Sequence, residues 1–222
     1  RDILFLKKDI FENYNNKELR ILTSSPRRVY NFSNFLESLL PFNPKRITFE
    51  DVRGNIPTRL KKLLHGDCQG LIVAKAAIDR LISYGNKDVS DKIQSYLDDL
   101  LWMIIPLSLN PCAPGQGAIA VEVNSKRKDI IELINKINHI ETFSQVIKER
   151  EILQNYGGGC HQKIGVSIES KFFGKILTIK GQTEEGLKIE KREVVNQNTD
   201  WKNIPEANFF PSNISKYKLF DR

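Results

Sequence analysis

The first half of the chain alternates short apolar runs with amphipathic stretches. Residues 20–23 predict a strand, and Ser24-Ser25-Pro26 follow it with the serine cap and early proline that begin many helices. Apolar residues at helical spacing from Val29 to Leu40 continue this helix. The other elements expected here are strands at 47–52 and 70–77 and helices at 55–65 and 89–101.

This order of elements predicts an α/β fold, with an open, doubly wound sheet of parallel strands and helices on its faces. The continuous apolar run at 70–77 is typical of a buried parallel strand. In such sheets, ligands bind beyond the carboxyl ends of the strands, next to the N-termini of the helices. We therefore expect a site at the strand-to-helix junctions of this domain.

The second half of the chain has a different pattern. Residues 115–123 predict a loop that enters a strand, and helices are expected over 127–137 and 141–155. Alternating polar and apolar residues then predict strands at 163–170, 175–182 and 187–195. The sequence thus predicts a small α+β domain after the sheet domain, with Cys160 on the loop that enters it.

Composition and charge narrow the class of protein. The 222 residues carry a net charge of +7, and no apolar stretch approaches the length of a transmembrane helix. Acidic small molecules fit the charge better than nucleic acid does, because no nucleic-acid motif is present and aromatic residues are not interleaved with the basic ones. The three cysteines and three histidines lack the spacing of a metal site or a disulfide framework. We expect a monomer without a metal, a membrane or a nucleic-acid partner, located in the cytoplasm.

Arginines recur where the predicted strands meet helices. They are Arg27, Arg28, Arg53, Arg59 and Arg80. A cation at a helix N-terminus opposes the helix dipole, so local stability does not explain them. Free backbone N–H groups, serine hydroxyls and guanidinium groups together would bind an anion, and arginine suits carboxylates best. The alternative is exposed arginines that happen to follow strands, but five at one sheet edge favour a polyanion-binding cleft. No P-loop or dinucleotide fingerprint points to a nucleotide.

The stretch Tyr156-Gly157-Gly158-Gly159-Cys160-His161 places a cysteine on a pliable loop. Most single cysteines are buried and inert. Here the glycines before Cys160 and the basic residues after it favour an exposed, electropositive setting, in which the thiolate form is stabilised. This pattern is compatible with a reactive, exposed thiol at Cys160 and also with a buried, inert one.

Four motifs together resemble one family. "LTSSPRR" (22–28), "DVRGNIPTRLKKL" (51–63), "APGQGAIAVEV" (113–123) and "YGGGC" (156–160) resemble, in order and approximate spacing, hydroxymethylbilane synthase, also called porphobilinogen deaminase. The resemblance implies three domains, of which the first two are similar to the lobes of a periplasmic binding protein and the third carries the cysteine. It implies a division into a second domain with the hinge (1–112), a returning strand and helix (113–138) and the C-terminal domain (139–222).

The resemblance also implies a function and a set of site residues. In that family, four porphobilinogen molecules are condensed stepwise into linear hydroxymethylbilane, with ammonia released, on the route to heme. Cys160 stands where the family carries a dipyrromethane cofactor through a thioether bond. The implied cofactor ligands are Ser24, Ser25, Arg27, Arg28 and Arg59, and the implied substrate-binding residues are Arg53, Arg80, Gln116 and Gly117.

The chain departs from the family pattern at its beginning. Only about twenty residues precede Thr23, so most of the first domain is expected to lie upstream or in another chain, together with the catalytic aspartate of a Lys-Asp pair. Lys8-Asp9 sits too close to Thr23 to be that pair, whereas Arg1-Asp2 resembles the hinge. An upstream transit peptide would change the location to an organelle. The alternative function is a non-catalytic, carboxylate-binding fragment or degenerate family member.

Overall fold

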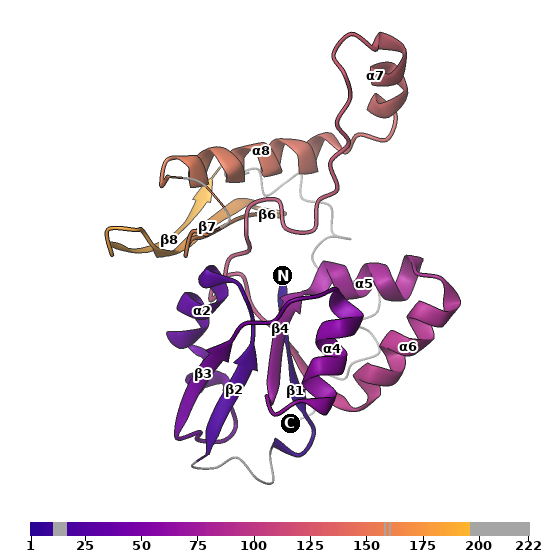
Figure 1. The fold of residues 1–222 in the computed structure, drawn as a ribbon. Helices are drawn as coiled ribbons and strands as arrows, with labels where there is room; N and C mark the ends of the chain where they lie inside the picture. The colour runs from indigo at the N-terminus through magenta and orange to yellow at the C-terminus, as the bar shows by residue number, and fades with distance from the viewer. Residues whose placement is uncertain (11–16, 158, 160, 196–222) are drawn as a thin grey trace, which may run out of the picture.

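The computed structural model describes residues 1–10, 17–157, 159 and 161–195. In these residues the chain forms a five-stranded sheet with helices on both faces, followed by a three-stranded sheet that packs against one long helix (Figure 1). The α/β class and the smaller α+β part that follows it are therefore confirmed. Within the same residues, no helix has the length and apolar character needed to cross a membrane.

The larger sheet has the strand order β3-β2-β4-β1-β5. Its strands are β1 (Asp2–Lys7), β2 (Glu18–Leu22), β3 (Arg46–Glu50), β4 (Gly70–Ala74) and β5 (Leu100–Ile104). Strand β2 pairs in parallel with β3 and β4, whereas β1 pairs antiparallel with β4 and β5. The expectation of a purely parallel sheet is therefore wrong, because a strand that the sequence pattern did not predict runs opposite to its two neighbours.

Helices cover both faces of this sheet, because successive side chains of a strand point to opposite faces. Leu4 and Ile72 face the side of α2 and α3, and Phe5 and Leu71 face the side of α4, α5 and α6. The helices are α2 (Pro26–Ser33), α3 (Leu36–Leu39), α4 (Ile56–His65), α5 (Lys75–Tyr84) and α6 (Lys87–Asp98). Each face thus has its own apolar core.

The helices that follow β2 and β3 begin where the sequence predicts. The Ser25 hydroxyl accepts a hydrogen bond from the backbone N–H of Arg28 at 3.4 Å, and Pro26 lies in the first turn of α2. Asn55 caps α4 in the same way, through the backbone N–H of Thr58 at 3.0 Å. Both caps follow the carboxyl ends of parallel strands, so the first turns of α2 and α4 lie at the same edge of the sheet.

Three predicted elements are each divided in the structure. The helix expected to continue to Leu40 is broken after Ser33 into α2 and α3. The apolar run at 70–77 is a strand only as far as Ala74, and Lys75 begins α5. The helix expected to reach residue 101 ends at Asp98, and the residues after it form β5. Periodicity does not separate a short buried strand from an adjoining helix, so these boundaries were missed.

The smaller sheet is antiparallel, with strand order β6-β7-β8. Its strands are β6 (Gly165–Lys171), β7 (Gly174–Gln182) and β8 (Lys188–Val195), as the alternating pattern predicts. Helix α8 (Ile140–Gln154) packs on it through Ile152 and Leu153, which contact a core that includes Val166 and Ile179.

Residues 118–138 extend away from both sheets, with α7 (Lys128–Asn135) at the far end (Figure 1). Residues 115–117 form a turn and residues 118–123 have no regular secondary structure, so the expectation of a strand there is wrong. A strand needs a neighbour with which to exchange backbone hydrogen bonds, and the described residues pair none with this segment. Apolar Ile119 is consequently 76% exposed.

Backbone contacts at 111–112 join the two sheets. The N–H of Val166 donates to the carbonyl of Cys112 at 2.9 Å, and the N–H of Cys112 donates to Ser167 Oγ at 2.7 Å. A Cβ added at Gly165 would lie 2.1 Å from the Pro111 oxygen and 3.1 Å from Cδ of Arg27. Strand β6 therefore lies directly against the first turn of α2, and only glycine fits at this point.

Candidate functional site

A buried carboxylate, Asp2, lies between two arginines of the first turn of α2. Asp2 Oδ2 accepts a hydrogen bond from Arg27 at 2.8 Å, and Asp2 Oδ1 accepts one from Arg28 at 2.8 Å. Asp2 has no exposed surface and Arg27 is 3% exposed. The antiparallel direction of β1 explains the contact, because it brings the start of β1 to the edge where the parallel strands end.

The loop after β5 completes this buried cluster. Asn110 Nδ2 donates to Asp2 at 2.6 Å and Gln116 Nε2 donates to Asp2 at 2.9 Å. Arg27 also donates to Asn110 Oδ1 at 2.9 Å and to the Pro111 carbonyl at 2.8 Å. We call these residues the Asp2 cluster: Asp2, Arg27, Arg28, Asn110 and Gln116.

The electrostatics of the cluster keep Asp2 ionised. Burial by itself raises the pKa of a carboxyl group, because it penalises the charged form. The charges and hydrogen bonds of Arg27 and Arg28 outweigh that effect and hold the pKa of Asp2 well below its ordinary value of 3.8. Asp2 is therefore a fixed negative charge, and it offers no proton for chemistry near neutral pH.

Next to Arg28 of the Asp2 cluster, Arg53 and Arg59 add two more positive charges. Partial burial lowers the pKa of Arg59, and the neighbouring charges of Arg28 and Arg53 lower it further. Arg59 Nε donates to the Gly54 carbonyl at 2.8 Å, and Arg28 Nε is buried without a hydrogen-bond partner. Among the described residues, neither Arg53 nor Arg59 forms an ion pair. The group thus has more positive charge than Asp2 balances, which favours a bound anion.

The two serines hold the loops that position these arginines. Ser24 Oγ donates to the Val52 carbonyl at 2.7 Å and accepts from the Val52 N–H at 2.9 Å. It thereby ties the end of β2 to the residue before Arg53. Ser25 is used as the cap of α2. Both hydroxyls therefore have intramolecular partners at the predicted site.

The remaining predicted residues are Arg80 on α5 and, on the loop that leaves the sheet, Gln116 and Gly117. Arg80 is exposed on α5 and donates to the carbonyl of Gly117. Gly117 has φ of 93°, a conformation that favours glycine, and its neighbour Gln116 belongs to the Asp2 cluster. Glu149 of α8 holds the same loop by accepting the Gly115 N–H at 2.8 Å, and burial raises the pKa of this carboxyl group.

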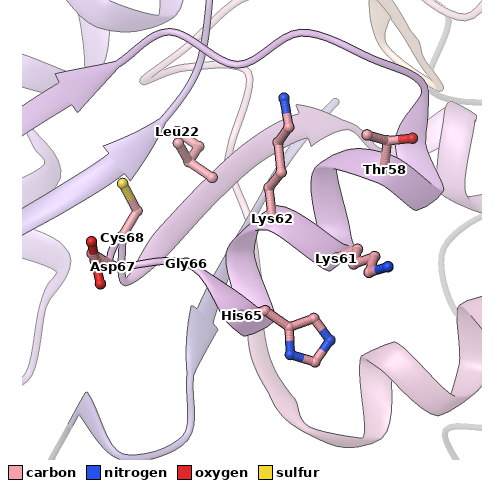
Figure 2. Close-up of a pocket in the computed structure, with 8 residues that line it drawn as sticks. All are labelled: Leu22, Thr58, Lys61, Lys62, His65, Gly66, Asp67 and Cys68. Carbon is pink, nitrogen blue, oxygen red and sulfur yellow. The ribbon is translucent and has the colours of Figure 1, made fainter.

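A separate cavity of about 490 Å³ lies beside α4, and Figure 2 shows its lining. The lining residues are Leu22, Thr58, Lys61, Lys62, His65, Gly66, Asp67 and Cys68. None of them is a predicted ligand, and burial raises the pKa of the Cys68 thiol to about 11, so the thiol is neutral and unreactive. The cavity reaches the first turn of α4 through Thr58, but none of the predicted arginines lines it.

The structure brings together most of the predicted residues, but in two different settings. Arg27 is buried and Gln116 is half-buried, both bonded to Asp2, while the exposed Arg53 and the half-buried Arg59 lie next to Arg28. The sequence reasoning missed the role of Asp2 and of Asn110. The hinge resemblance of Arg1-Asp2 was the available signal for Asp2, and no pattern pointed to Asn110. Cys160 and Gly158 lie outside the described residues.

Comparison with known proteins places the chain in a family. Residues 1–132 match the family model described as porphobilinogen deaminase, dipyromethane cofactor binding domain. The chain therefore belongs to the porphobilinogen deaminase family. It is 31% identical over 198 residues to porphobilinogen deaminase of Nostoc sp., and the aligned residues cover 86% of this chain and 54% of the relative. It is 36% identical over 168 residues to probable porphobilinogen deaminase of Sulfurisphaera tokodaii, covering 76% of this chain and 49% of the relative. The chain spans about half the length of these curated relatives.

The Asp2 cluster predicts a large and pH-dependent effect on stability. We expect Asp2→Asn to lower the free energy of unfolding by about 3–5 kcal/mol at neutral pH, because it leaves two guanidinium groups without their buried counter-charge. Since the pKa is lower in the folded protein, Asp2 stabilises above its unfolded value of 3.8, and this stabilisation is lost as the pH falls through the folded-state pKa. Urea unfolding at neutral and acidic pH measures both effects.

The matched control is Asp79→Asn, which removes an exposed carboxylate paired with Lys75 at 2.7 Å. Surface pairs contribute little, so we expect a change below about 1 kcal/mol and no altered acid sensitivity. An Asp2→Asn protein as stable as this control at neutral pH would mean that Asp2 is not a needed counter-charge for Arg27 and Arg28.

Proposed function

We propose that the protein to which this chain belongs is a hydroxymethylbilane synthase, which condenses four porphobilinogen molecules stepwise into linear hydroxymethylbilane and releases ammonia. The observation that carries the proposal is the surplus of positive charge at Arg28, Arg53 and Arg59, at the sheet edge of a chain from the porphobilinogen deaminase family. Each porphobilinogen has two carboxylates, so the lengthening product accumulates negative charge and needs such a surface.

The residues present fit a dipyrromethane cofactor. Arg28 Nε is a buried donor without a partner, and Arg59 is a cation surrounded by like charges. A carboxylate of the cofactor would satisfy both. When bound, the cofactor supplies the pyrrole end to which the first substrate is added. Ser24 and Ser25 position the loops that bear these arginines, and the buried Arg27 holds α2 against Asp2.

Cys160 is the proposed attachment point, on the basis of the glycine-rich motif alone. The two flanking glycines that the structure describes, Gly157 and Gly159, have φ of 97° and 102°. Residues with a Cβ rarely adopt such values, so the loop geometry next to Cys160 requires glycine. Arg53 and Arg80, with the loop at Gln116 and Gly117, are proposed contacts of the growing chain.

We further propose that this chain is the second and third domains of the enzyme, with boundaries at 1–112, 113–138 and 139–222. The sheet domain corresponds to one lobe of a periplasmic-binding-protein-like pair. The first domain, upstream or in another chain, supplies the catalytic aspartate and covers segment 113–138. The exposure of Ile119 and Leu133 on that segment supports this, because it leaves apolar side chains uncovered. A cytoplasmic location is part of the same proposal.

The cofactor assignment has a direct test. The complete protein, made in cells that synthesise porphobilinogen, should have an intact mass raised by one dipyrromethane, and Cys160→Ser should abolish the increase. Cys68→Ser, which changes a buried thiol of the sheet domain, is the matched control and should keep the cofactor. A bare thiol in the folded, complete protein would contradict the assignment. Cofactor without release of ammonia from porphobilinogen would favour the alternative, a non-catalytic carboxylate-binding protein.

The arginine surface gives a second prediction. We expect Arg59→Gln in the complete protein to reduce turnover or cofactor retention at least about tenfold, since a charge-assisted hydrogen bond to a carboxylate is lost. The thermal midpoint should stay close to that of the wild type, because the substitution also removes repulsion with Arg28 and Arg53. Lys61→Gln on the same helix is the control, with turnover unchanged. Unaltered turnover of Arg59→Gln would refute a role in carboxylate binding.

The proposed contact of segment 113–138 with the first domain gives a third prediction. Ile119→Asp should lower the stability of the complete protein by about 2 kcal/mol or more, because it buries an unpaired charge at the interface, and should leave the 222-residue chain unaffected. Leu187→Asp, on the exposed turn between β7 and β8, should have little effect in either form. Equal stability of wild type and Ile119→Asp in the complete protein would argue against this contact.

A further inference from the structure

Residues 111–112 lie along the outer edge of β6 in the smaller sheet. Because β6 is at an edge, its outward backbone groups need partners other than a neighbouring strand. The outward N–H of Val166 has such a partner in the carbonyl of Cys112, at 2.9 Å. Outward groups recur at every second residue, so the next N–H on this edge is that of Ile168. The chain turns away at 114–117, before it can offer a second carbonyl to the strand.

The carboxylate of Glu149 is the partner at this position. Glu149 lies on α8, and its Oε1 accepts the N–H of Ile168 at 2.8 Å. Its other oxygen, Oε2, accepts the N–H of Gly115 in the turn, also at 2.8 Å. One side chain thus joins the edge of the smaller sheet to the loop that leaves the larger sheet.

The two contacts together require a carboxylate. A glutamine has a single acceptor atom in its side chain, so its amide nitrogen would face one of the two N–H groups. Glu149 is half-buried and forms no ion pair among the described residues, since Lys148 of the same helix pairs with Glu151. Burial raises the pKa of Glu149, while the two backbone N–H groups favour its charged form.

The turn also packs on α8 through an apolar contact. Gly115 has φ of 71°, and a Cβ added there would lie 3.1 Å from Cγ1 of Val146. Val146 precedes Glu149 by three residues, so both side chains lie on the same face of the helix. The position of the turn therefore follows the position of α8.

The next two residues of the turn belong to the proposed site. Gln116 donates to Asp2 at 2.9 Å, and the carbonyl of Gly117 accepts from Arg80. A displacement of Gly115 would move both residues, because they are its immediate neighbours in the chain. Glu149 therefore acts on this part of the site without being a part of it.

We propose that Glu149 is a positioning residue, which holds Gln116 and Gly117 in one place relative to the smaller sheet. Cys160 lies shortly before β6 in the chain, so the same carboxylate relates the proposed attachment point to the turn. The growing chain then meets its contacts at Gln116 and Gly117 in a constant geometry. This inference rests on the proposed function, because it concerns contacts of the growing chain.

The bridge itself is tested by amide hydrogen exchange in the complete protein. The amides of Gly115 and Ile168 should both be protected in the wild type. We expect Glu149→Gln to raise the exchange rate of one of them at least about tenfold, because one N–H loses its acceptor, and Glu149→Ala to raise both. Unprotected amides in the wild type, or unchanged rates in both variants, would overturn the inference.

The positioning role is tested by the kinetics of Glu149→Gln, once circular dichroism shows that it is folded and intact mass shows that it carries the cofactor. We expect kcat to fall at least about tenfold while KM for porphobilinogen changes less than about threefold, because the turn contacts the growing chain rather than the incoming molecule. A purely structural residue would lower the thermal midpoint without this division between kcat and KM. Wild-type turnover despite faster amide exchange would show that the bridge has no positioning role.

Glu151→Gln is the matched control, since Glu151 is an exposed carboxylate of the same helix, paired with Lys148 at 3.3 Å. Its amide exchange and its kcat should equal those of the wild type. A complete wild-type protein without cofactor would defeat the proposed function and the positioning role together. Cofactor-loaded protein whose kcat is indifferent to Glu149→Gln would defeat the positioning role alone.

Discussion

The structure depends on one buried ionic contact, the carboxylate of Asp2 between the guanidinium groups of Arg27 and Arg28. It ties the start of β1 to the first turn of α2 and, through Asn110 and Gln116, to the loop that leaves the sheet. Burying three charges is costly unless each has partners, and here the carboxylate accepts from four donors. The same contact sets the position of Arg28, which faces Asp2 on one side and the arginines of the surface on the other.

Charge imbalance at this edge connects the fold with the proposed function. Asp2 balances part of the positive charge of α2, while Arg53 and Arg59 add more within reach of Arg28. A fold selected for stability alone would place acidic residues in the first turns of α2 and α4, and neither helix has one. The stability lost by this arrangement is explained if an anion with several carboxylates binds there. Arg27 has a different task from its neighbour, because its two terminal nitrogens are already bonded inside the protein.

Sequence reasoning found the parts of the fold that are encoded locally. The caps at Ser25 and Asn55 and the alternation in β6 and β7 depend on near neighbours, and all are present in the structure. Strand β1 was missed because it is buried on both faces and shows no periodicity, and its antiparallel direction depends on pairing with β4 and β5. Residues 115–123 have the composition of a strand, but no described residue pairs with them. The arginines could be predicted from their positions after strands, whereas their division into buried and surface groups depends on Asp2, which lies 25 residues before Arg27.

Asp2 is the ionised counter-charge on which these contacts depend at neutral pH, and its own titration checks this. The carboxyl carbon of Asp2 can be followed by NMR in the folded, complete protein as the pH is lowered. We expect the signal to stay at its ionised position until the pH is well below 3.8, because Arg27 and Arg28 hold the proton off. A midpoint at or above 3.8 would mean that burial outweighs the two arginines and that Asp2 is not held ionised by them.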